Sequence, residues 1–231
     1  MNRVLIWLFS FLSLVNIYAV LIQWQMGIYF SKPLLLTILS CWFYLSVKNG
    51  FTSFAKLIVT ALVFSIAGDV FLMFVPNNPS FFLFGLGSFL VTHLLYIFSF
   101  VKYKGFKGGF VMKNKWLVVP VLTYLISFIH FLWPEIPGDF LIPVVIYSCI
   151  ISIMLIAAIN MRERVENSVS NGLTVGAVLF VISDSLIAIN KFKTIGISSA
   201  YLGVLIMATY LIGQYLIAKN AIRANRNKEI V

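Results

Sequence analysis

Long apolar stretches follow one another along the whole chain, separated by short polar segments. Each stretch is about 18 to 22 residues long, the length that a helix needs to cross the hydrocarbon core of a bilayer. A transmembrane barrel would instead show alternating segments of about ten residues. The pattern predicts an all-α polytopic membrane protein, a single transmembrane domain over residues 1–231 built as a bundle of eight transmembrane helices. The expected spans are 4–22, 29–47, 55–75, 81–101, 116–133, 140–160, 170–190 and 198–218.

The seven prolines agree with these boundaries. Proline is tolerated in loops and in the first turn of a helix, where its missing N–H has no intrahelical partner to lose. We expect three prolines in first turns and four in loops, so that none interrupts a span. The first set is Pro33, Pro120 and Pro143, and the second is Pro76, Pro79, Pro134 and Pro137.

Basic residues lie mainly on one side of the predicted membrane. Of the seventeen Lys and Arg residues, fourteen fall on one side and only Lys32, Lys191 and Lys193 on the other. The positive-inside rule then places both termini in the cytoplasm. The fourteen are Arg3, Lys48, Lys56, Lys102, Lys104, Lys107, Lys113, Lys115, Arg162, Arg164, Lys219, Arg223, Arg226 and Lys228.

Composition narrows the class further. Hydrophobic side chains make up 61% of the chain and charged ones 10%, which excludes a soluble domain with a polar shell. The net charge of +10 resides in short loops, so the expected partner is the lipid bilayer and no nucleic acid. Cys41 and Cys149 lie in apolar stretches and indicate no redox compartment. Abundant Phe, Ile, Lys and Asn favour a multi-pass protein of a bacterial inner membrane, whereas the oligomeric state is not indicated.

Two aspartates are the only acids within the predicted spans: Asp69 in FSIAGDVFLMF and Asp184 in FVISDSLIAINKF. A carboxyl group at membrane depth is unfavourable and usually functional, although it can also simply join helices by hydrogen bonds. Each aspartate is the fifteenth residue of an outward-running span, so the two lie at one level and form a pair if their helices are neighbours. The other acids, in loops or the tail, are Glu135, Asp139, Glu163, Glu166 and Glu229.

Other polar side chains within the spans could serve these acids. His93 and Tyr96 share one helix face, as do Tyr210 and Gln214. Lys32 opens the second span on the outer side, where it could meet an acid, a lipid phosphate or only the interface. The two histidines lie at opposite levels, so no metal site is expected. The supporting candidates are Lys32, His93, Tyr96, Tyr147, Ser183, Tyr210 and Gln214.

A set of these positions resembles the YhhN family, the lysoplasmalogenases, from the second span to the eighth. The set is Lys32-Pro33, Gly68-Asp69, Phe89 with His93 and Tyr96, Tyr147, Ser183-Asp184-Ser185 with Ala188, and Tyr210 with Gln214. The resemblance implies an eight-helix membrane hydrolase that needs no cofactor. Its lysophospholipid substrate would be a lysoplasmalogen, an alkenylglycerophosphocholine or alkenylglycerophosphoethanolamine, whose vinyl ether is cleaved to a fatty aldehyde and a glycerophospho-base.

The aspartates suit this chemistry. Protonation of the alkene gives an oxocarbenium ion that water attacks, which requires an acid, a nearby negative charge and a water. Two close carboxyls favour one protonated and one ionised group. We therefore expect one of Asp69 and Asp184 to deliver the proton and the other to stabilise the cation and orient the water, as in glycosidases. The sequence does not assign the two roles.

Two other functions are compatible with the same residues. A proton-coupled carrier of a small solute or lipid would use the aspartates as a proton relay, although such carriers usually have interrupted helices. A sensor or structural bundle would use them to hold helices together. Turnover of substrate separates the enzyme from both alternatives.

Overall fold

The computed structural model describes residues 2–105 and 107–229. Eight helices in this part are long and apolar enough to cross a membrane, and no strand occurs in it, which confirms the predicted class. A helix suits the bilayer interior because all its backbone hydrogen bonds are internal. The spanning helices are α1 (Asn2–Leu21), α2 (Gln25–Val47), α3 (Ser53–Met73), α4 (Phe81–Lys104), α6 (Val118–Leu132), α7 (Gly138–Ile159), α8 (Asn167–Phe192) and α9 (Ser199–Glu229). The short ones are η1 (Lys48–Gly50), α5 (Phe110–Lys113), η2 (Lys115–Leu117) and η3 (Trp133–Glu135).

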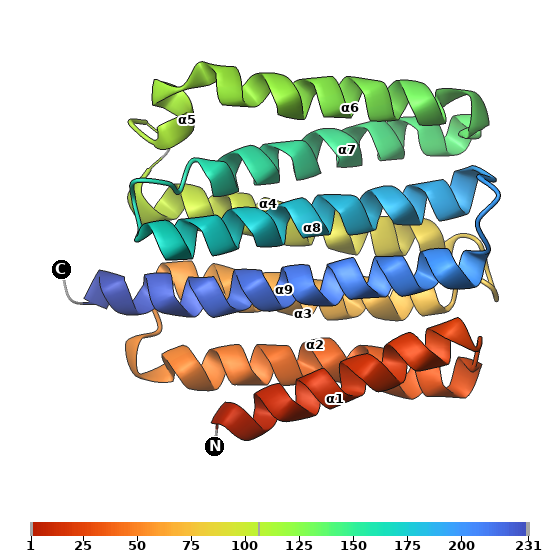
Figure 1. Ribbon diagram of the computed structural model, residues 1–231, viewed down its shortest axis with the longest axis horizontal. Coiled ribbons are helices and arrows are strands. Elements are labelled where there is room, and N and C mark those ends of the chain that lie inside the picture. The colour runs from red at the N-terminus through yellow and green to blue at the C-terminus, as the bar shows by residue number, and fades with distance from the viewer. Residues whose placement is uncertain (1, 106, 230–231) are drawn as a thin grey trace.

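The spanning helices lie side by side, and α1 begins at the same end of the bundle at which α9 finishes (Figure 1). Consecutive helices form closely packed pairs, α1 with α2, α3 with α4, and α8 with α9. Helix α9 also contacts α1, α2 and α3, so it joins the two halves of the chain. Helix α6 packs along α7 and forms one edge of the bundle (Figure 1).

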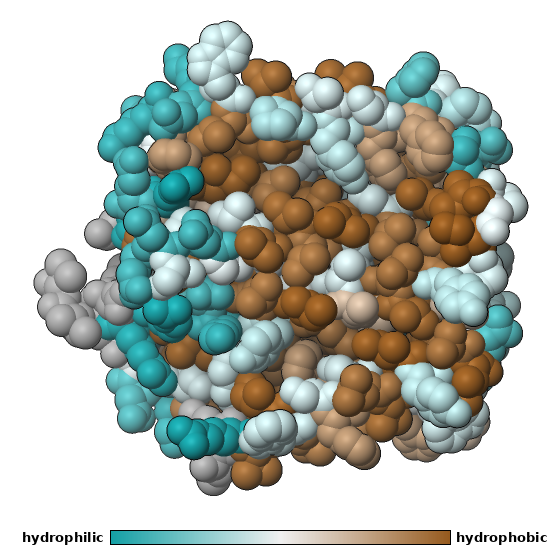
Figure 2. Space-filling view, viewed as in Figure 1, coloured by the Kyte–Doolittle hydropathy of each residue, from teal (hydrophilic) through white to brown (hydrophobic). Residues whose placement is uncertain are grey.

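The surface is divided as a membrane protein requires. Figure 2 shows an apolar belt bounded by a broad hydrophilic end on the left, where the chain begins and ends, and by smaller polar patches on the right. Large apolar side chains such as Trp7, Ile126 and Ile142 are exposed on the helices, as lipid contact permits. The side chains of Lys104, Lys228 and Glu229 lie outside the described residues. Placement of the basic end in the cytoplasm stays a prediction.

Two of the proline predictions were wrong. Helix α2 begins at Gln25 and α7 at Gly138, so Pro33 and Pro143 lie inside these helices rather than in their first turns. Lys32 is accordingly the eighth residue of α2 and does not open it. A span predicted from a run of apolar residues begins too late in these two helices, because their first turns carry polar or small residues. Because two helices contain an internal proline, the positions of the prolines do not argue against the carrier function.

Helix α9 extends well beyond the predicted end at residue 218, to Glu229. Its last turns are polar, yet Ala221, Ala224 and Asn225 are buried. The Asn225 side chain donates to the Gly50 carbonyl at 2.7 Å, which anchors the extension beside the α2–α3 connection. Hydropathy cannot detect this part of the helix because tertiary contacts, not apolar character, hold it.

Two glycines set the distance between α8 and α9, the helices that carry Asp184 and Tyr210. A Cβ on Gly176 would lie 2.9 Å from the Gly213 carbonyl oxygen, and a Cβ on Gly213 would lie 2.9 Å from the Gly176 carbonyl oxygen. The two backbones therefore touch, as small residues allow in membrane helices.

We expect Gly176→Ala to destabilise the protein by about 1 to 3 kcal/mol, because the new methyl group meets backbone that cannot move aside. The measurement is the melting temperature of the detergent-solubilised protein. Gly87→Ala is the matched control, since a Cβ on this exposed helical glycine meets no heavy atom within 4 Å. Equal melting temperatures for the two variants would contradict the close packing of α8 on α9.

Candidate active site

Asp184 lies at the meeting point of three helices. Its Oδ2 is 3.0 Å from Nε2 of His93 on α4, and the Tyr147 hydroxyl on α7 donates to the same oxygen. The His93 Nε2 is also 2.9 Å from the Tyr147 hydroxyl oxygen. All three side chains are at least nine-tenths buried. An acid, an imidazole and a phenol thus form one compact hydrogen-bonded group.

Asp69 is held by a different set of helices. Its Oδ2 accepts a hydrogen bond of 2.8 Å from the Tyr210 hydroxyl on α9, and its Oδ1 is 3.5 Å from Nζ of Lys32 on α2. The Lys32 side chain is only 14% exposed and that of Asp69 only 3%. This is an almost buried ion pair, in which each charge depends on the other.

A third polar group lies on α3, α4 and α9. The Tyr96 hydroxyl donates to Gln214 Oε1 at 2.6 Å, and Gln214 Nε2 donates to Ser65 Oγ at 2.9 Å. Ser65 Oγ in turn lies 3.2 Å from Thr92 Oγ1. These residues serve as hydrogen-bond donors and acceptors for one another. None of these hydrogen bonds involves Asp69 or Asp184.

Aromatic rings pack against partner residues of both aspartates. The Phe180 ring centroid is 4.7 Å from that of His93 and 5.5 Å from that of Tyr210. Phe89 packs on Tyr210 as well, at 5.8 Å between centroids. In the part of the chain that the structure describes, the hydrogen bonds and ion pairs of Asp69 and Asp184 have no residue in common. The acids therefore belong to two neighbouring groups that share aromatic packing.

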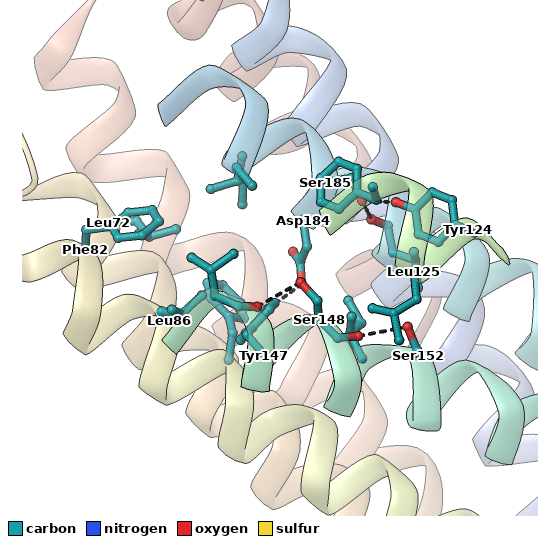
Figure 3. A pocket seen from close by; sticks show the side chains of 17 residues that line it. Leu72, Phe82, Leu86, Tyr124, Leu125, Tyr147, Ser148, Ser152, Asp184 and Ser185 are labelled. Atoms are coloured by element: carbon teal, nitrogen blue, oxygen red, sulfur yellow. Dashed lines mark hydrogen bonds between the residues drawn. The ribbon is translucent and has the colours of Figure 1, made fainter. Parts of the chain in front are cut away.

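A narrow slot opens beside Asp184. It has a volume of about 40 Å³ and is bounded by α3, α4, α6, α7 and α8, room for about three water molecules. Figure 3 shows Asp184 and Tyr147 joined on one side of it, with Tyr124 and Ser185 joined across from α6 to α8. Asp69 is not among the residues that line the slot.

The structure thus brings together some predicted residues and not others. His93 and Tyr147 contact Asp184, whereas Lys32 and Tyr210 contact Asp69. Tyr96 and Gln214 belong to the third group. Ser183 donates to the Ile206 carbonyl at 3.1 Å and so joins α8 to α9 rather than serving Asp184.

Three polar residues of the slot were missed by sequence reasoning: Tyr124, Ser148 and Ser152. Ser148 and Ser152 are one turn apart and each hydroxyl donates to a carbonyl four residues earlier, which leaves oxygen lone pairs for the slot. Two serines at this spacing in an apolar helix are a signal that could have been used. Tyr124 offers no such signal, because its span has few other polar residues. Among the described residues, no three His, Cys, Asp or Glu side chains gather to hold a metal ion.

Fold and site together define a polytopic helical membrane protein that holds ionisable side chains at membrane depth. The chain belongs to the YhhN family, whose profile matches residues 27–221. Lysoplasmalogenase TMEM86A of Bos taurus is 32% identical over 179 residues, 76% of this chain and 69% of that protein. Lysoplasmalogenase TMEM86B of Homo sapiens is 28% identical over 180 residues, 78% and 68% of the two chains.

A bacterial protein shows a similar likeness over a shorter stretch. Lysoplasmalogenase of Mycobacterium bovis is 33% identical over 139 residues, 58% of this chain and 49% of that protein. No solved structure was found to match the chain.

Proposed function

We propose that this protein is a lysoplasmalogenase, an enzyme of the cell membrane that hydrolyses the vinyl ether of a lysoplasmalogen to a fatty aldehyde and a glycerophospho-base. Family membership and the names of the relatives support the activity. The Asp184 group supports the chemistry, because it joins a carboxyl, an imidazole and a phenol beside a water-sized slot inside the apolar belt.

One observation carries the role of Asp184. Within the described residues, its hydrogen bonds with Tyr147 and His93 both involve Oδ2, which leaves Oδ1 for the slot. A proton on Oδ1 is then positioned for transfer to the terminal alkene carbon of the substrate. The resulting carboxylate keeps the Tyr147 and His93 hydrogen bonds on Oδ2, and these stabilise its charge.

The reaction then proceeds with water. Proton transfer from Asp184 converts the vinyl ether to an oxocarbenium ion, which the new Asp184 carboxylate stabilises electrostatically. A water in the slot adds to the cationic carbon and returns a proton to Asp184, so the acid is regenerated. The hemiacetal breaks its bond to the glycerol oxygen and yields aldehyde and alcohol. Asp69, opposite Lys32, supplies a fixed second carboxylate in the adjoining group, and since it does not line the slot, no proton of this reaction passes through it.

The test is turnover by the purified protein in D₂O. Incubation with an alkenyl lysophospholipid, with reduction of the aldehyde as it forms, is expected to give a fatty alcohol with one deuterium on the carbon next to the former aldehyde carbon. A saturated 1-O-alkyl lysophospholipid has no alkene to protonate and is expected to give no product. Aldehyde formed without that deuterium would show that the alkene is not protonated. An absence of aldehyde, with proton-coupled flux into liposomes instead, would favour the carrier.

Tyr147→Phe tests the hydrogen bond to Asp184. Hydrogen bonds to charged groups contribute about 1.5 to 3 kcal/mol, so loss of the hydroxyl is expected to lower kcat by roughly 10- to 100-fold. The measurement is the initial rate of aldehyde release at saturating substrate. Tyr124→Phe is the matched control, because this slot tyrosine bonds to Ser185 rather than to an acid, and it is expected to retain kcat within about threefold. Equal losses in both variants would mean that the slot, not the bond to Asp184, was disturbed.

A further inference from the structure

A second cavity adjoins the slot at the end of the bundle opposite the chain termini. It is an open groove of about 250 Å³, and Lys32, Asn190 and Lys191 are its polar lining residues. Leu72, Phe82 and Ile187 line both cavities, so these residues form a wall that the two cavities share. The groove therefore leads from the end of the bundle opposite the chain termini to the wall that it shares with the slot of Asp184.

Lys191 lies at the rim of the groove. Its Nζ is 5.4 Å from the centroid of the Phe82 ring, which forms part of the shared wall. A cation over an aromatic face is attracted by the ring and keeps its donors for other partners. The exposed Lys191 ammonium is thus held close to the point where the groove meets the slot.

Asn190 and Lys32 add donors to the same space. The Asn190 Oδ1 accepts a hydrogen bond of 2.9 Å from Ser199 Oγ. The amide N–H groups of Asn190 can therefore donate hydrogen bonds to a ligand. The Lys32 ammonium has three donors and faces Asp69 Oδ1 at 3.5 Å. With both lysines charged and Asp69 ionised, the formal charge at the groove is two positive minus one negative, a net +1.

We propose that this groove binds the phosphodiester of the lysophospholipid, between the ammonium groups of Lys32 and Lys191 and with Asn190 as a further donor. A phosphodiester carries one negative charge, which matches the net +1 of the groove. This inference rests on the proposed function, because it places the vinyl ether, one glycerol unit from the phosphate, at the wall shared with the slot of Asp184. The groove then selects for a phosphate-bearing substrate.

The test compares two substrates in two lysine variants. Lys191→Ala is expected to raise KM for the alkenyl lysophospholipid about fivefold, as loss of an exposed ionic contact worth about 1 kcal/mol would, with kcat unchanged. For a 1-alkenylglycerol, which lacks the phosphate, both constants are expected to be unchanged. Lys193→Ala is the matched control: this lysine is at the same helix end but faces Glu135, 3.6 Å away, and does not line the groove. Equal increases in KM for both substrates, or none for either, would overturn the proposal.

Soluble competitors distinguish a lipid headgroup from a free anion. Glycerophosphoethanolamine is expected to inhibit competitively, and more weakly against Lys191→Ala. Inorganic phosphate that competes equally well would mean an anion site without a preference for the headgroup, and the proposal would be wrong.

Failure of the proposed function has a different signature. If the wild-type protein releases no aldehyde from either substrate, the groove is tested by binding of a 1-O-alkyl lysophospholipid, read as an increase in melting temperature. A smaller increase in Lys191→Ala than in Lys193→Ala supports the groove, and equal increases refute it.

Discussion

Asp184→Asn is expected to lower kcat for aldehyde release by about 10² to 10⁴-fold, the range over which a positioned acid or base accelerates proton transfer. An amide has nearly the same shape as the carboxyl and can still bond to Tyr147 and His93, yet it holds no proton that it can deliver to the alkene. The measurement is kcat by aldehyde trapping, together with the melting temperature. The fold should be retained, since Asp184 forms no ion pair with Lys or Arg in the described part of the chain.

Asp139→Asn is the matched control for this variant. It makes the same chemical change to an exposed acid in the first turn of α7, so kcat should stay within about twofold, as for most exposed substitutions. If Asp184→Asn kept wild-type kcat, Asp184 would not be the proton donor.

Lys32→Met is expected to have the largest effect on stability. It leaves the Asp69 carboxylate, whose side chain is 3% exposed, without its cation. Removing one member of a buried ion pair costs about 3 to 5 kcal/mol, whereas removing both is often neutral. The melting temperature should therefore fall in Lys32→Met and recover in the double variant Lys32→Met with Asp69→Asn.

The double variant also separates folding from catalysis. It is expected to fold and yet to hydrolyse substrate slowly, because both the fixed carboxylate and one phosphate ligand are gone. Lys193→Met, which breaks a more exposed ion pair with Glu135, should change stability by less than about 1 kcal/mol. A double variant as unstable as Lys32→Met would contradict the pairing of Lys32 with Asp69.

The sequence could indicate candidate site residues because each is a polar exception within an apolar helix. Asp69 and Asp184 follow directly from this, as do Lys32, His93 and Tyr147. What could not be predicted is which residue bonds to which. His93 and Tyr147 meet at Asp184, and Lys32 and Tyr210 meet at Asp69, because of how α2, α4, α7 and α9 are arranged around α3 and α8. Spacing along one helix carries no information about the neighbouring helices.

The expectation that the two aspartates form a pair stays a prediction, because the structure gives each acid its own hydrogen-bond partners. Equal depth in the membrane follows from counting residues, but side-chain direction and the rings between the helices do not. Phe180 packs against His93 of one group and Tyr210 of the other, and Phe89 packs against Phe180. In an apolar sequence, a phenylalanine that lies in the site cannot be distinguished from one that faces lipid. The place of Tyr124 in the slot escaped prediction in the same way, since it depends on α6 lying across the slot from α8.

The slot and the groove lie in two different surroundings, one apolar and one polar. The slot lies among apolar helices, and the groove ends beside lysines at the end of the bundle opposite the chain termini, where Figure 2 shows smaller polar patches. The lysophospholipid would therefore be cleaved at the wall that the two cavities share. The long-chain aldehyde would pass into the bilayer, and the glycerophospho-base would pass into water. Because the fragments partition into separate phases, they would rarely meet again at the enzyme. Product inhibition by the aldehyde would then depend on the amount of membrane present, and inhibition by the glycerophospho-base on its concentration in solution.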